Sequence, residues 1–174
     1  MSTPEGDEAI GIVKGGQLAL AGLFDRLDEE AMTRPATIGG GDWSAKDLLG
    51  HIAFWEELAV DTLTAWRGGH PPPTDADEWP GVDAANARNQ ERTTRESLAE
   101  VRERAAAAHA DVVTQLQTVT AAEWASEPFY PGADNPTLGD LLGGVLGGSG
   151  GPLKHIEATL ATLRRHGQAV NNYD

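Results

Sequence analysis

The chain contains no cysteine, so disulfide bonds, thiolate metal sites and thiol nucleophiles are all excluded. Basic residues are scarce: 13 lysines and arginines stand against 27 aspartates and glutamates, which gives a formal net charge of -14. A field of this sign repels nucleic-acid phosphates and anionic lipid headgroups. The composition therefore predicts neither a nucleic-acid partner nor a membrane partner, and the lack of cysteine fits a cytoplasmic protein.

Long apolar runs are absent as well. No stretch approaches the roughly 20 apolar residues that a membrane-spanning helix needs, and the run over residues 138–153 is both short and rich in glycine. The first seven residues are polar and acidic, unlike a secretory leader. A length of 174 residues suits one domain with one core, so we expect residues 1–174 to form a single helical domain with a loose tail at 168–174.

What the chain does have is helical periodicity, and no segment shows the sustained alternation of a strand. The pattern predicts an all-α protein. Expected helices cover about residues 8–27, 45–66, 82–93, 97–117 and 137–163, the last interrupted by a glycine cluster and Pro152. Capping-box spacings at Ser44, Ser97 and Thr120 predict two long helices and a short turn. The long connection over residues 68–81 is of a kind that is often functional.

The segment from Gly41 to Glu57 is the most informative part of the sequence. Its apolar face is formed by residues at three- and four-residue steps: Leu48, Ile52, Trp55 and Ala59. His51 lies one helical turn before Trp55, and Glu56 and Glu57 follow directly. An imidazole and carboxylates therefore lie on or beside the face that should turn inward. This pattern predicts a polar pocket inside a helical bundle.

The polar residues of this segment leave several roles open. His51 fits a general base, a metal ligand or a hydrogen-bonded core histidine. Glu56 and Glu57 are about 100° apart on a helix, so one can turn inward while the other faces solvent. A glutamate in an apolar cavity has a raised pKa and can act as acid or base, whereas the alternative is two solvated glutamates. Asp47 is first a helix cap and second a partner that could orient the His51 ring.

Five tryptophans are many for this length. Most are expected in the core, but Trp55 and one or two loop tryptophans could form a wall that stacks on a planar ligand. The tryptophans considered for ligand binding are Trp43, Trp55, Trp66 and Trp79. Asp47 joins them as a candidate through its position before His51.

Several motifs occur in a characteristic order along the chain. G-D-W-S-A-K-D-L-L-G-H-I-A-F-W-E is followed by W-P-G-V-D-A-A-N, by T-L-G-D-L-L-G-G-V and by K-H-I-E-A-T-L. In this order the chain resembles the DinB/YfiT-like superfamily of four-helix bundles and, within it, the ClbS/DfsB branch. The resemblance implies an up-down-down-up, DinB-like four-helix bundle with a central pocket, long loops and one or two short extra helices.

Many members of the superfamily hold a divalent metal with three histidines, one on the second helix and an H-x-x-x-H pair on the last. His51 matches the first of these and His155 matches one of the pair. Thr159 and Gly151 occupy the two positions where its partner could stand. The resemblance therefore implies no tightly bound metal; a weakly held divalent ion would use His51 and His155, with a carboxylate such as Glu157.

The ClbS/DfsB branch implies a different chemistry, in which a DNA-alkylating natural product is disarmed by opening a strained ring with water. The function expected from this resemblance is a self-resistance hydrolase acting on a small molecule that carries an aziridine or a cyclopropane. His51, with Glu56 or Glu57, would activate water, and His155 would donate to the leaving group or steady the water. Asn86 falls where the branch often carries asparagine, and would hold water or ligand or merely cap a turn.

Two other functions stay open at this stage. One is a metal-dependent thiol S-transferase of the DinB/YfiT type, and the other is a protein that sequesters a drug without turnover. The oligomeric state is also open, since an exposed apolar helix face would support a homodimer.

Overall fold

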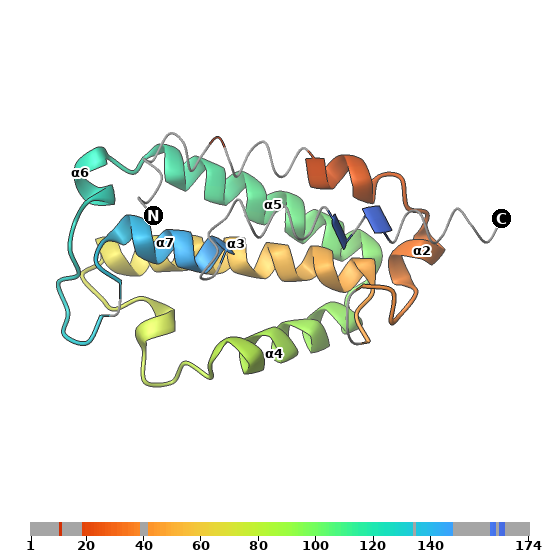
Figure 1. Cartoon of the computed structure of the whole chain (residues 1–174), viewed down its shortest axis with the longest axis horizontal. Helices are drawn as coiled ribbons and strands as arrows, with labels where there is room; N and C mark the ends of the chain where they lie inside the picture. The colour runs from red at the N-terminus through yellow and green to blue at the C-terminus, as the bar shows by residue number, and fades with distance from the viewer. Residues whose placement is uncertain are drawn as a thin grey trace.

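The computed structural model describes residue 11, residues 19–38, 42–133 and 135–147, and residues 161, 162, 164 and 165. Residues 19–24 are helical. The elements that follow are α2 (Glu29–Thr33), α3 (Ala45–Arg67), the 3-10 helix η1 (Pro73–Asp75), α4 (Val82–Arg95), α5 (Leu98–Gln117), α6 (Ala121–Trp124) and α7 (Leu138–Gly147). The described residues include no strand, so the all-α, bundle-type prediction is confirmed (Figure 1).

The capping boxes begin helices where the sequence places them. The Ser44 hydroxyl accepts a hydrogen bond from the Asp47 backbone N–H at 3.1 Å, and the Asp47 carboxylate accepts one from the Ser44 backbone N–H at 2.8 Å. The same exchange starts α5 at Ser97 and α6 at Thr120. Each box satisfies backbone N–H groups that have no partner inside the helix. The expected starts near residues 45 and 97 are therefore confirmed, and α4 also begins at the expected residue 82, although it has no side-chain cap.

The central element is α3, which packs against α5, α4, α7 and α2. Figure 1 shows α5 and α4 on opposite sides of α3, with α7 alongside it. The first half of α3 shares one apolar cluster with the start of α5 and with residues 20–38. Its second half shares another with the end of α5 and with α7. α3 therefore belongs to both clusters, and its two halves pack against different parts of the bundle.

Two short elements were not among the expected helices. One is η1, within the predicted long connection, and the other is α2. The Asp28 carboxylate accepts from the Ala31 backbone N–H at 2.8 Å, and two glutamates follow in the first turn of α2. An acidic N-cap with acidic first-turn residues is a helix start signal that could have been read from the sequence.

Several expectations concern residues outside the described part of the chain. They are the glycines at 39–41, most of the first helix, the glycine-rich segment at 148–151 with Pro152, the later part of the last helix with His155, and the tail at 168–174. Within the described part, the first helix ends at residue 24, before the expected residue 27. None of the helices described has both the length and the apolar character needed to cross a bilayer.

Candidate functional site

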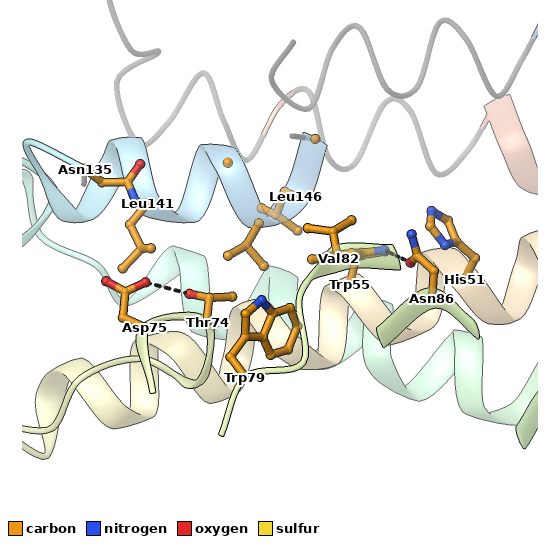
Figure 2. A pocket seen from close by; sticks show the side chains of 13 residues that line it. His51, Trp55, Thr74, Asp75, Trp79, Val82, Asn86, Asn135, Leu141 and Leu146 are labelled. Carbon is orange, nitrogen blue, oxygen red and sulfur yellow. Dashed lines mark hydrogen bonds between the residues drawn. The ribbon is translucent and has the colours of Figure 1, made fainter. Parts of the chain in front are cut away.

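A cavity of about 410 Å³ lies between α3, α4, α7 and the connection that carries η1. This volume suits a small-molecule ligand. The described residues that line it are His51, Trp55, Thr74, Asp75, Trp79, Val82, Asn86, Asn135, Leu141, Gly144, Val145, Leu146 and Gly147 (Figure 2). The wall from α7 is apolar, whereas the polar side chains come from α3, α4, the η1 connection and, with Asn135, the loop before α7. The site is thus a mostly apolar chamber with a few polar side chains in its walls.

Trp55 links the two polar side chains that α3 and α4 bring to the cavity. Its indole N–H donates to the Asn86 Oδ1 atom at 3.1 Å (Figure 2). An indole N–H can only donate, so this bond fixes which end of the Asn86 amide faces Trp55. The amide nitrogen of Asn86 is then the end that can donate to a ligand. The ring centroid of Trp55 also lies 6.2 Å from that of His51, and the two rings meet in an edge-on arrangement.

His51 is held between two indoles. Trp43 meets it edge-on from the other direction, with ring centroids 5.2 Å apart. The His51 side chain is half-buried and borders the cavity. Such packing limits the rotation of the ring, which a residue that orients water or a ligand requires.

Glu56 does not line the cavity. It is buried on the face of α3 that packs against α5, where its Oε1 atom lies 2.9 Å from the Nδ1 atom of His109. His109 lies on α5, 53 positions further along the chain, and was not among the expected site residues. The structure therefore pairs Glu56 with His109 and not with His51.

Glu57 does not line the cavity either, and its carboxylate lies near arginines of α4 and α5. Its Oε2 atom lies 3.2 Å from an Arg92 guanidinium nitrogen, and its Oε1 atom lies 3.9 Å from one of Arg104. Of the four side chains expected to be catalytic, the described structure places only His51 at the cavity. His155 lies outside the described residues.

Three of the six expected ligand-binding residues line the cavity, and the other three do not. Trp55, Trp79 and Asn86 line the cavity. Trp66 is buried elsewhere, with its ring centroid 5.3 Å from that of Phe129. Trp43 reaches the site through its contact with His51, and Asp47 is buried as the partner in the Ser44 cap.

Sequence analysis missed the polar groups that η1 contributes. Thr74 and Asp75 line the cavity, and the Asp75 carboxylate accepts a hydrogen bond from the Tyr130 hydroxyl at 2.9 Å. Burial, together with the hydrogen bond and negative charge of Asp75, raises the pKa of the Tyr130 phenol above its ordinary value. The length of the 68–81 connection pointed to this region, but no periodicity in a loop could select these residues.

The described residues do not supply the three ligands that a tight metal site would need. No group of three histidine, cysteine, aspartate or glutamate side chains converges in the described part of the chain. Of the two histidines that the resemblance offered, only His51 belongs to that part. The described donors therefore assign no metal site, and we assign no chemical step to a metal.

The chain belongs to the DinB superfamily, whose family model matches residues 16–147. It is also similar to the crystal structure of an uncharacterised protein from Escherichia coli UTI89, with 17% identity over 98% of both chains and a TM-score of 0.78. At this identity the likeness establishes the fold alone. No curated protein matches the chain. The superfamily part of the sequence resemblance is thereby confirmed.

Proposed function

We propose that this member of the DinB superfamily is a hydrolase that binds a small electrophilic molecule and opens its strained three-membered ring with water. The observation that carries the proposal is a largely apolar cavity in which His51 and Asn86 both contact Trp55. The resemblance of the 41–56 motif to the ClbS/DfsB branch supplies the ring chemistry, with an aziridine or a cyclopropane as the reacting group. Such a reaction would protect a cell against a DNA-alkylating natural product.

In the proposed step, water attacks a ring carbon while the His51 imidazole accepts a proton from that water. A carbon–oxygen bond forms, and one ring carbon–nitrogen or carbon–carbon bond breaks. The atom that takes the released electron pair accepts a hydrogen bond from the Asn86 amide nitrogen. The proton then passes from the imidazole to the leaving atom, so the reaction consumes only water and substrate.

The walls of the cavity support this step in two ways. Trp55 and Trp79 offer aromatic surface on which a planar substrate can pack. The apolar wall of α7 limits the water around the reacting ring, which strengthens the polar contacts from His51 and Asn86. The proposal uses neither Glu56 nor Glu57, because the structure engages both carboxylates on other faces of α3.

The test is to incubate the purified protein with 2-phenylaziridine, and separately with a spirocyclopropyl enone, in ¹⁸O-labelled water. Ring-opened product that carries the label, formed in excess over protein, is expected from at least one probe. Removing the base in His51→Ala should slow this reaction by about 100-fold or more. His70→Ala removes an exposed loop histidine and should leave the rate unchanged.

Other outcomes of the same experiment contradict the proposal. Consumption that stops at one equivalent per protein would indicate sequestration or capture. A reaction that requires both an added thiol and a divalent metal would indicate an S-transferase. An undiminished rate in His51→Ala would remove the assigned base.

A further inference from the structure

A second, smaller hollow lies on the other side of Trp79. Its volume is about 270 Å³, and its walls come from α3, α4 and the loop that joins η1 to α4. The lining residues are Phe54, Trp79, Pro80, Ala85, Arg88, Asn89 and Arg92. Trp79 lines both this hollow and the cavity. The second hollow shares no other described residue with the first.

Asn89 lines this hollow and carries a buried hydrogen-bond acceptor. The residue is only 3% exposed, and its Nδ2 atom donates to the Gly50 carbonyl at 3.2 Å. That bond fixes the orientation of the amide. The Oδ1 atom is buried and accepts a hydrogen bond from no described residue. Buried polar atoms in native proteins nearly always have a partner, so this atom points to a ligand that carries an N–H or O–H donor.

The two arginines of the hollow differ in their pairing. Arg92 is 3.2 Å from Glu57 and 3.1 Å from Glu96, so nearby carboxylates already balance its charge. Arg88 is exposed and forms no ion pair with any residue in the described ranges. In a chain with a net charge of -14, an arginine without an acidic partner beside an aromatic hollow favours an anionic ligand.

We propose that this hollow is a second ligand site, which binds a small carboxylate-bearing molecule with a planar ring and an amide N–H. The ring would pack on Trp79 and Phe54. The amide N–H would donate to the Asn89 Oδ1 atom, and the carboxylate would pair with Arg88. The site stands apart from the proposed hydrolysis, because its occupancy requires no turnover.

The probe for this site is N-benzoylglycine, which carries all three groups, and its neutral match is N-benzoylglycinamide. Binding is measured by calorimetry and by chemical-shift changes in ¹⁵N-labelled protein. We expect the acid to bind up to about fivefold more tightly than the amide, since an exposed ion pair contributes at most about 1 kcal/mol. The shifts should centre on the backbone of Phe54, Arg88 and Asn89.

Arg88→Gln should abolish the preference for the acid over the amide. The matched control is Arg95→Gln, which changes the net charge equally on the same helix but alters an arginine that is 79% exposed and paired with Glu91. Equal binding of the two probes, or equal loss in both variants, would overturn the proposal. Shifts that centre instead on Leu141 and Val145 would place the probe in the cavity and would also overturn it.

Discussion

The two ends of α4 meet α3 in opposite ways. At the C-terminal end of α4, Thr93 is fully buried against Gly50, and Asn89 donates to the Gly50 carbonyl. At the N-terminal end, Val82 and Asn86 border the cavity, and Asn86 reaches α3 through its bond with Trp55. Figure 1 shows the same difference in the ribbon, where α4 approaches α3 toward its C-terminal end.

The side chains of α3 account for this difference. Gly50 has no side chain, so α4 can approach the α3 backbone closely at that point. One turn later Phe54 and Trp55 stand on α3; Phe54 lines the smaller hollow and Trp55 lines the cavity, so the helices are held apart there. We call the C-terminal end of α4, with Asn89 and Thr93, the closed end, because it packs directly on α3 at Gly50. We call the N-terminal end, with Val82 and Asn86, the open end, because it leaves a space that a ligand can enter. For the cavity and its proposed reaction, the comparison predicts that changes at the closed end mainly reduce stability and that changes at the open end mainly alter binding and turnover.

The largest loss of stability is expected from Arg104→Met. Arg104 lies on α5 with a side chain only 9% exposed, and it ties the closed end together through Thr93 at 3.0 Å and Glu96 at 2.8 Å. Its removal leaves the buried Thr93 hydroxyl without its donor and takes from Glu96 the less exposed of its two arginine partners, so that only Arg92 remains. We expect the free energy of unfolding to fall by about 3 kcal/mol, as measured by urea denaturation.

The control for Arg104→Met is Arg102→Met on the same helix. Arg102 is exposed, so its replacement should change the free energy of unfolding by less than about 0.5 kcal/mol. Equal losses in the two variants would show that Arg104 does not hold the closed end together.

The next largest effect is expected from Gly50→Ala. A Cβ atom at this position would lie 2.7 Å from the Thr93 Cγ2 atom and 3.0 Å from an Arg104 nitrogen. The helices must then separate, which should reduce the free energy of unfolding by about 1 to 2 kcal/mol despite the better helix propensity of alanine. Gly144→Ala on the cavity wall is the control, because no described atom lies within 4 Å of its Cβ position. A Gly50→Ala protein as stable as the control would contradict a close-packed end.

Two asparagines on α4 test the comparison within a single helix. Asn89→Ala removes the buried bond to the Gly50 carbonyl and should reduce the free energy of unfolding by about 1 kcal/mol. Asn86→Ala affects a half-buried side chain, so it should reduce stability less while slowing ring opening more. Urea denaturation measures the loss of stability in both variants, and the ring-opening assay measures their rates. A larger loss of stability in Asn86→Ala together with a larger loss of rate in Asn89→Ala would contradict the assignment of the two ends.

The sequence predicted the helices of this chain well because local signals determine where helices start. The capping boxes at Ser44 and Ser97 depend only on residues three positions apart, and both structures form as expected. Trp55, Trp79 and Asn86 were likewise predicted as site residues, and all three line the cavity. That these three residues bind a ligand stays a prediction.

The partners of Glu56 and Glu57 could not be predicted in the same way. Adjacent residues on α3 point in directions about 100° apart, and which neighbour covers each direction depends on the arrangement of the whole bundle. His109, the partner of Glu56, lies 53 positions away along the chain. Asp75 presented a different difficulty, since a loop has no period from which its inward side chains can be recognised.

The smallest effect is expected at the open end, from Tyr130→Phe. The Tyr130 hydroxyl donates to Asp75 at the cavity wall, and the net contribution of this bond at neutral pH should be below about 1 kcal/mol. Its signature lies in the pH dependence. Burial and the neighbouring Asp75 raise the pKa of Tyr130 in the folded protein above 10.0, the reference value that we take for the unfolded chain. The stabilisation is therefore fully present below that value. At higher pH the unfolded chain releases a proton that the folded protein keeps, and the stabilisation falls until the pH has passed the raised pKa of the folded state.

Urea denaturation from about pH 9 to about pH 11 should thus show a steeper loss of stability in the wild-type protein than in Tyr130→Phe. Asn89→Ala, at the closed end, should keep the wild-type slope although its stability is lower throughout. Parallel slopes for wild type and Tyr130→Phe would show that Asp75 and the burial of the phenol do not hold its proton. A reduced slope in Asn89→Ala would show instead that the two ends of α4 are coupled, and the distinction between a closed end and an open end would then fail.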